Sequence, residues 1–197
     1  SKSGLFVTLL QNVRSKVIEM MVDKNGAWKT KEVNLPNTGS IYIASANAYD
    51  PTIFFSYEDH ITPDTLYEFN PSERTLQPIK SLPARFDASN LVVEQFEVQS
   101  KDGERVPYFI IRSKTTELTG QTPTILYGYG GFEISLTPSY SSTRGKLWLE
   151  RGGAYAIANI RGGGEFGPRW HKAALKENRQ RAYDAVSYTH LRAHETI

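Results

Sequence analysis

Apolar and polar residues alternate in short runs along the first 80 positions, with turn residues between the runs. Such alternation over roughly 4–8 residues predicts strands, because successive side chains of a strand point to opposite faces. Asn25 and Gly26 supply the positive φ of a tight hairpin, and Pro71 presets a β-turn. The pattern therefore predicts an antiparallel meander with strands at 5–10, 16–22, 27–33, 40–46, 52–57, 65–69 and 75–79.

A sequence repeat runs through this meander. Residues 5–8 (LFVT) match residues 53–56 (IFFS), 48 positions later, and Leu35-Pro36 matches Leu82-Pro83, 47 positions later. Repeats of about 45 residues with four strands each are typical of β-propeller blades. We expect one full blade from residue 40 to about residue 80, preceded by three strands of another blade whose innermost strand would lie before residue 1. A β-sandwich has similar strand spacing and is the alternative.

The pattern changes after residue 84. Strands are expected at 91–99 and 106–112, joined by a hairpin turn that contains Asp102 and Gly103. A strand at 124–129 follows, then a helix that includes Tyr140, Leu147 and Trp148 and ends at residues 152–153. A strand at 154–160 and a helix from Pro168, with Trp170, Ala173 and Ala174 as its apolar face, complete the series.

A hairpin followed by strand, helix, strand and helix is the opening order of an α/β-hydrolase sheet. The expected fold is thus an all-β propeller fragment of about two blades, residues 1–84, followed by the N-terminal part of an α/β-hydrolase domain, residues 85–186. Residues 187–197 are expected to be a non-native tail, as described below.

Two apolar runs each lead directly into a glycine cluster. Residues 123–127 precede 128–132 (GYGGF), and residues 154–160 precede 161–167 (RGGGEFG). Both runs predict strands buried on both faces of a mostly parallel sheet, and the glycines allow positive φ and close approach of backbone to a ligand. In α/β-hydrolases, the loop after the third strand contributes to the oxyanion hole. In this chain that loop is residues 128–132. The sequence contains no Gly-x-Ser-x-Gly, so it would carry only the supporting part of such a site.

Composition excludes several classes of protein. The net charge of +2 is spread over both signs without a basic stripe, so no nucleic acid partner is expected. No apolar run approaches the ~20 residues of a membrane span. The absence of cysteine excludes disulfides and Cys-based metal sites, and it fits the cytoplasm and the periplasm equally. We expect no cofactor, no metal and no obligate protein partner.

Residues 162–167 also satisfy G-x-G-x-x-G after a strand and before a helix, which is the context of a dinucleotide site. Against this alternative, Glu165 would place a carboxylate beside the pyrophosphate, and no second strand ends in an acidic residue about 20 positions onward. A dinucleotide-binding α/β domain is one alternative function, and a propeller-derived peptide-binding module formed by residues 1–83 is another.

Several motifs together resemble the prolyl oligopeptidase family of serine peptidases: residues 127–132 (YGYGGF), 158–167 (ANIRGGGEFG), 170–171 (WH) and 86–88 (FDA). The resemblance covers roughly residues 5–184. Members join a β-propeller to an α/β-hydrolase domain that cleaves short peptides after proline through Ser, Asp and His. The resemblance implies that this chain holds the last propeller blades and the first part of the hydrolase domain. It also implies that the chain alone is inactive, because it lacks the Ser, Asp and His of the triad.

The resemblance also implies roles for individual residues. Tyr129 matches the tyrosine whose hydroxyl helps to form the oxyanion hole, and a phenol that stays protonated at neutral pH can donate a hydrogen bond to a developing oxyanion. Phe132 matches an aromatic residue that lines the pocket near the proline-side subsites, although a lone Phe at a strand end is often core. Asn159, Arg161 and Glu165 recur without a known chemical role, and we interpret them as an ion pair or a loop brace.

Residues 187–197 (SYTHLRAHETI) match nothing expected of the family, and we interpret them as foreign sequence joined to a truncated reading frame. His190 and His194 have the i, i+4 spacing of a zinc helix, but no glutamate follows the first His as H-E-x-x-H requires. His60 and His171 are expected on the solvated surface rather than as a triad base.

Overall fold

The computed structural model describes residues 1–117 and 119–196, with side chains described to residue 193. The chain divides into two compact units, which are described separately. The first comprises Ser1–Ala84 with Pro138–Tyr140, and the second comprises Arg85–Thr137 with Ser141–Ile197. No helix of the described residues has the length and apolar character needed to cross a membrane.

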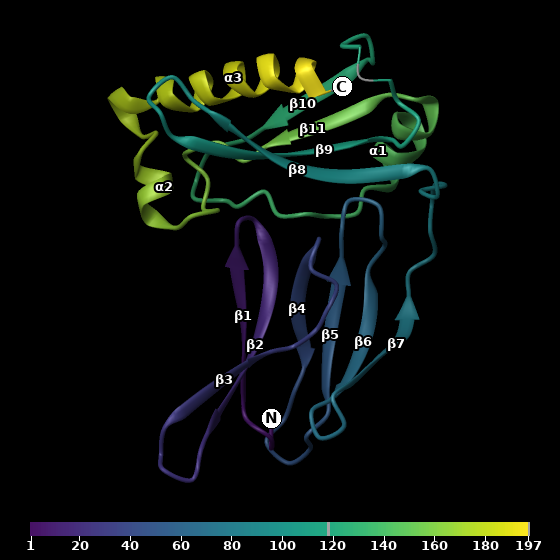
Figure 1. Cartoon of the computed structure of the whole chain (residues 1–197), viewed down its shortest axis with the longest axis vertical. Helices are drawn as coiled ribbons and strands as arrows, with labels where there is room; N and C mark the ends of the chain where they lie inside the picture. The colour runs from purple at the N-terminus through teal and green to yellow at the C-terminus, as the bar shows by residue number, and fades with distance from the viewer. Residues whose placement is uncertain (118, 197) are drawn as a thin grey trace. The chain divides into compact units, whose positions relative to one another are not determined.

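The first unit consists of two antiparallel meanders (Figure 1). The three-stranded sheet contains β1 (Leu5–Gln11), β2 (Arg14–Val22) and β3 (Trp28–Glu32), and the four-stranded sheet contains β4 (Ser40–Ser45), β5 (Ile53–Glu58), β6 (Thr65–Asn70) and β7 (Thr75–Ser81). In both sheets each strand pairs with the next in sequence. This order confirms the predicted full blade and the three strands of a preceding one, and it favours blades over a Greek-key sandwich.

The alternation of apolar and polar residues along the strands explains how the two sheets of this unit bury a common core. On β5, Ile53, Phe55 and Tyr57 are buried while the residues between them are partly exposed. Phe6 of β1 packs against Phe55 and Phe69, with ring centroids 6.5 Å and 6.2 Å apart. Residues 5–8 and 53–56 therefore repeat because each contributes an apolar strand to the same core.

The second unit contains a four-stranded sheet in the order β10-β11-β9-β8. Its strands are β8 (Leu91–Gln99), β9 (Arg105–Ser113), β10 (Thr124–Gly128) and β11 (Ala154–Ala158), and its helical segments are α1 (Ser142–Leu147), η1 (Leu149–Arg151), α2 (Pro168–Lys172), η2 (Lys176–Asn178) and α3 (Gln180–Thr196). β8 and β9 form the expected hairpin, and β10 and β11 are parallel. This arrangement matches the expected start of an α/β-hydrolase domain.

Burial of the two strands before the glycine clusters differs from the prediction in one case. β11 lies inside the sheet and is buried almost throughout, as predicted. β10 is an edge strand within the described sheet, and its residues Ile125 and Tyr127 are exposed. The prediction that both strands are buried on both faces is therefore wrong for β10, which has one neighbouring strand, β11, in the described sheet. The sheet is also mostly antiparallel, since β10 and β11 form its one parallel pair among the described strands.

The helix before β11 begins at Ser142, later than predicted from the spacing of the apolar residues Tyr140, Leu147 and Trp148. Ser141 caps α1 by accepting a hydrogen bond from the Arg144 N–H at 3.3 Å, so Tyr140 lies outside the helix. Leu147 is exposed. The predicted end is confirmed, because Gly152 adopts a left-handed conformation (φ 85°) immediately after η1.

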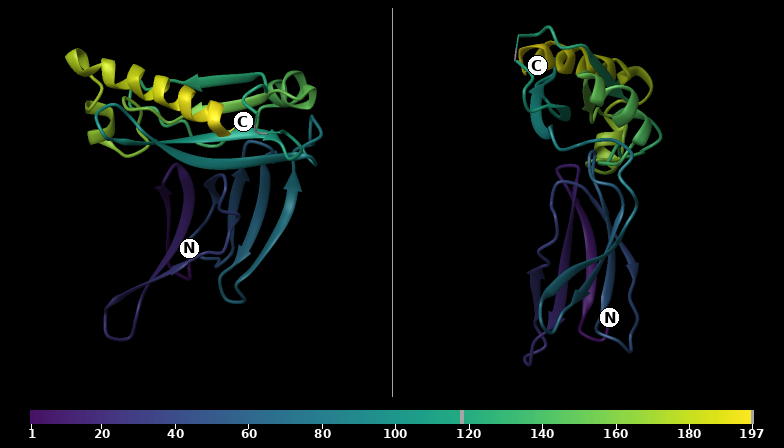
Figure 2. Two further views of the ribbon diagram at one scale, coloured as in Figure 1. Left: turned by 45° about the horizontal axis from the view of Figure 1, so that its top comes forward. Right: turned by 90° about the vertical axis from the view of Figure 1, so that its right-hand side faces the viewer.

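Helix α3 lies along one face of the β8–β11 sheet (Figures 1 and 2). Its residues Ala182, Ala185 and Ala193 belong to the buried core together with Tyr108 and Ile110 of β9. α3 continues without interruption through the segment interpreted as a non-native tail, and Thr189 within it is buried. That interpretation stays a prediction, and Ile197 and the His194 side chain fall outside the described residues.

Candidate functional site

The two glycine clusters lie side by side at one edge of the second unit's sheet. β10 and β11 are parallel neighbours, and their register pairs Gly128 with Ala158 at the carboxyl ends of both strands. Residues 128–132, the first glycine loop, and residues 161–167, the second glycine loop, therefore leave the sheet at the same edge. Crevices at this edge of α/β sheets are where ligands bind.

The two loops touch through their backbones, which explains why glycine is required. Gly130 has φ 57°, and a Cβ there would lie 2.6 Å from the carbonyl oxygen of Arg161. Gly162 has φ 100°, and a Cβ there would lie 2.1 Å from the carbonyl oxygen of Gly130. Both conformations and both distances exclude an ordinary side chain. The glycines thus bring the loop after β10 into direct contact with the loop after β11.

Tyr129 is a partly exposed tyrosine of the first glycine loop. The side chain is 38% exposed, and within the described part of the chain no group hydrogen-bonds its hydroxyl. The ring lies across Gly131, since a Cβ on that glycine would be 3.6 Å from Cε1 and 3.9 Å from the hydroxyl oxygen. An accessible phenol without a protein acceptor can donate its hydrogen bond to a ligand.

Phe132 lies at the end of the first glycine loop and is 84% exposed, so it is not a core residue. Its φ is 51°, and that of the next residue, Glu133, is 57°. Two consecutive left-handed residues that are not glycine cost roughly 1–3 kcal/mol each, and such strain gathers at functional sites. The backbone here holds an aromatic ring out in solvent, where it can contact a ligand.

His171 of α2 connects the second glycine loop to the backbone just after the first. Its Nδ1 lies 2.7 Å from the carbonyl oxygen of Gly162 and 3.1 Å from the backbone nitrogen of Glu133. The Glu133 N–H also approaches the Gly162 oxygen at 3.3 Å. His171 is partly buried and makes structural contacts, so its placement on the solvated surface is wrong.

His60 was also expected on the surface, and this expectation is wrong as well. The side chain is 2% exposed, beside a buried network in the first unit. In that network Tyr57 donates to the Asp59 carboxylate at 2.7 Å, and Thr38 Oγ1 lies 2.8 Å from the Tyr57 hydroxyl oxygen. Burial, more than the neighbouring carboxylate, raises the pKa of Tyr57.

Arg161 forms an ion pair, but its partner is Asp102 rather than Glu165. The guanidinium, 3% exposed, binds both carboxylate oxygens of Asp102 and also approaches Ser100 Oγ at 3.3 Å. Hydrogen bonds from Arg161 are the main reason that the pKa of Asp102 is lowered. The pair connects the β8–β9 turn to the second glycine loop.

Glu165 braces the backbone that follows the first glycine loop. Its Oε1 accepts hydrogen bonds from the Leu136 N–H at 2.9 Å and from Asn159 Nδ2 at 3.3 Å, and the same Asn159 amide donates to the Leu136 carbonyl at 2.8 Å. Both side chains are buried. The predicted loop brace is therefore present, built from Asn159 and Glu165, with Arg161 tied elsewhere.

The comparisons with known proteins agree with this geometry. Residues 1–82 match the model of the prolyl oligopeptidase N-terminal β-propeller domain, and residues 138–189 match that of the prolyl oligopeptidase family. The chain belongs to the prolyl oligopeptidase family. Within that family, it is 47% identical over 184 residues to an uncharacterized peptidase of Sinorhizobium fredii, covering 93% of this chain and 25% of that protein.

Two further family members have informative names. The prolyl endopeptidase of Elizabethkingia miricola is 34% identical over 179 residues, covering 91% of this chain and 25% of that protein. The solved structure of a post-proline cleaving enzyme from Rickettsia typhi aligns with a TM-score of 0.84 and 32% identity, covering 100% of this chain and 28% of that one. The chain thus spans about a quarter of the length of these relatives.

Two residues that support the glycine loops, Asp102 and Arg179, could not be identified from the sequence. Asp102 is visible in the sequence as part of a hairpin turn, and nothing local indicates that it meets Arg161, 59 positions later. Arg179 binds the carbonyl oxygen of Gly130 from a polar segment that has no motif. No sequence signal identifies either residue, because each pairing depends on the fold.

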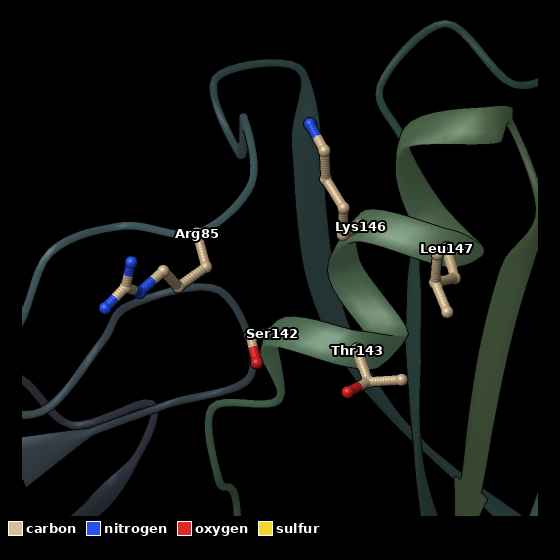
Figure 3. A pocket seen from close by; sticks show the side chains of 5 residues that line it. All are labelled: Arg85, Ser142, Thr143, Lys146 and Leu147. Carbon is tan, nitrogen blue, oxygen red and sulfur yellow. The ribbon is translucent and has the colours of Figure 1, made fainter.

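A separate open pocket of about 360 Å³ lies at the start of α1. It is lined by Arg85, Ser142, Thr143, Lys146 and Leu147 (Figure 3). The charged ends of Arg85 and Lys146 point in different directions, and Lys146 pairs with Glu150 at 2.7 Å. The pocket contains neither Tyr129 nor Phe132. Among the described residues, no group of three or more His, Cys, Asp or Glu side chains could hold a metal ion.

Proposed function

We propose that this chain is part of a serine peptidase that hydrolyses short peptides on the carboxyl side of proline, with Tyr129 as a donor in the oxyanion hole. The observation that carries the proposal is the position of Tyr129, partly exposed and with no hydrogen-bond partner for its hydroxyl among the described residues, on a loop at the carboxyl ends of two parallel strands. The names of the Elizabethkingia and Rickettsia relatives support cleavage after proline.

Tyr129 would act when the complete enzyme's serine gives its proton to a general base and attacks the carbonyl carbon of the scissile bond; the protonated base is then the general acid. The carbonyl π electrons move onto oxygen, which becomes an oxyanion, and the Tyr129 O–H donates a hydrogen bond to it. The C–N bond then breaks, and the amine leaves with a proton from the general acid, so that an acyl-enzyme remains for water to hydrolyse. Donors that are fixed in advance stabilise the charge without reorganising during the reaction.

Phe132 would contact the substrate close to its proline. The exposed ring offers a flat apolar surface, and burial of a proline ring against it would contribute to binding at about 25 cal/mol per Å² of apolar surface removed from water. The loop already presents the ring to solvent without substrate, so its backbone need not rearrange for the ring to make this contact. Phe132 is accordingly proposed as a substrate-binding residue.

The 197-residue chain itself is proposed to be inactive. Its sequence contains no Gly-x-Ser-x-Gly, so a hydrogen-bond donor is present without the nucleophile that it would assist. The purified chain should show no turnover of a chromogenic peptide with proline before the scissile bond. Turnover that a serine-directed reagent abolishes would contradict this part of the proposal.

The substrate class is tested on the full-length protein that contains this segment. Two chromogenic peptides are compared, identical except for proline or alanine before the scissile bond. The proposal expects a higher kcat/KM for the proline peptide. Equal values for the two peptides would overturn cleavage after proline, and no turnover of either peptide would overturn the peptidase itself.

A further inference from the structure

Arg179, between η2 and α3, contacts both glycine loops. Its guanidinium donates a hydrogen bond to the carbonyl oxygen of Gly130. The same nitrogen lies 3.0 Å from the position that a Cβ on Gly162 would occupy. The guanidinium also stacks over the Tyr183 ring, 5.4 Å from its centroid, which limits its movement. One side chain therefore touches the first loop at its middle and the second loop at its closest approach to the first.

The bond to Gly130 constrains the peptide on which Tyr129 rests. In a trans peptide the carbonyl and the following N–H point in opposite directions, so fixing the Gly130 oxygen also fixes the orientation of the Gly131 N–H. Gly131 is the residue across which the Tyr129 ring lies. A glycine-rich loop loses much conformational entropy when it is ordered, and without an anchor it would sample other conformations.

We propose that Arg179 is a positioning residue for Tyr129. It does not reach the reacting atoms. It holds the Gly130–Gly131 peptide, and through that peptide it holds the phenol at the place where the oxyanion forms. Arginine suits the task because its planar group can donate to a carbonyl while it stacks on an aromatic ring. The inference rests on the proposed function, since it deepens the role given there to Tyr129.

The test uses the full-length enzyme with Arg179→Met, which keeps the length of the side chain and removes its donors. We expect kcat to fall roughly 10- to 100-fold with KM almost unchanged, because misplacing an oxyanion donor weakens binding of the transition state more than binding of the substrate. Arg179→Lys, which restores one donor, should recover most of the loss.

Arg181→Met is the matched control. Arg181 lies two residues after Arg179, and its guanidinium is 3.7 Å from the Asp102 carboxylate; among the described residues, none of its hydrogen bonds involves the first glycine loop. Arg181→Met removes one positive charge close to Arg179 and should leave kcat unchanged. Equal losses in the two variants would overturn the proposal, because they would indicate a general effect of charge. A rise in KM with unchanged kcat would also overturn it.

A double-mutant cycle with Tyr129→Phe separates this inference from the proposed function. If Arg179 acts through Tyr129, Arg179→Met should reduce kcat little further in the Tyr129→Phe enzyme. Full additivity would overturn the positioning role. If Tyr129→Phe alone leaves kcat unchanged, the proposed function fails and this inference fails with it. If Tyr129→Phe lowers kcat and Arg179→Met does not, this inference alone fails. Should Arg179→Met not fold, the same cycle with Arg179→Gln decides.

Discussion

A Cβ on Gly162 would lie 2.1 Å from the carbonyl oxygen of Gly130. The two backbones are therefore in contact at this point, with no room for a side chain between them. Tyr129 and Phe132 flank this contact on the first loop. The other loop in the contact begins about 30 residues later in the sequence.

This contact predicts that Gly162→Ala destabilises the protein. A left-handed φ costs a residue with a Cβ roughly 1–2 kcal/mol, and the clash with a backbone oxygen should add about 1–3 kcal/mol. Gly152→Ala is the control, because Gly152 also has a left-handed φ but has nothing within 4 Å of its Cβ position. Denaturant unfolding of the full-length protein measures both, and equal losses of stability would show that the loops do not press on each other.

The ion pair between Arg161 and Asp102 predicts a pH-dependent contribution to stability. Asp102→Asn leaves the buried guanidinium without its carboxylate and should cost about 1–2 kcal/mol at neutral pH, a value kept small because Asp102 is 36% exposed and water screens the pair. Glu97→Gln, which breaks the exposed pair with Arg105, should have no measurable effect.

The sign of this pH effect follows from the lowered pKa of Asp102. A carboxyl whose pKa is lower in the folded state stabilises the fold above its unfolded pKa of about 3.9, and it loses that contribution as the pH falls through the folded pKa. The difference in unfolding free energy between the native protein and Asp102→Asn should be constant from about pH 5 to 7 and shrink below about pH 4. A difference that grows toward acid would contradict the pairing.

Because the Phe132 ring is exposed, we expect its removal to weaken substrate binding without changing the stability of the protein. Phe132→Ala should raise the KM for a proline peptide severalfold, because it removes the apolar surface, while the melting temperature stays the same. Phe166→Ala is the matched control in the second glycine loop. Phe166 packs against Trp170 at 4.8 Å between centroids, so its removal should lower stability and leave KM unchanged. A loss of stability in Phe132→Ala would indicate that the ring is a core residue.

Local patterns predicted the elements of this chain well, because they depend on neighbouring residues. The alternation on β5 and the repeat between residues 5–8 and 53–56 indicated the blades, and the runs before the glycine clusters indicated β10 and β11. The glycine clusters also identified the loops correctly, because tight backbone contact demands residues without a Cβ.

Features that depend on partners distant in the sequence could not be predicted in this way. The Arg161 partner was expected on the same loop, yet Asp102 meets it because β9 pairs with β11 and carries its turn to the second loop. His60 is buried although Glu58, Asp59 and Thr62 close to it in the sequence are polar. The exposure of β10 depends on the lack of a second neighbour in the described sheet, and no pattern within the strand encodes this.

The most direct test of the account is Tyr129→Phe in the full-length enzyme, with Tyr127→Phe as control. Tyr127 is a tyrosine of β10, two residues earlier, with a similar exposed fraction (43% against 38%), and no role is proposed for it. Steady-state turnover of a proline peptide should show kcat reduced on the order of 100- to 1000-fold for Tyr129→Phe, with KM little changed, and no change for Tyr127→Phe. An unchanged kcat in Tyr129→Phe would contradict the claim that its hydroxyl stabilises the oxyanion.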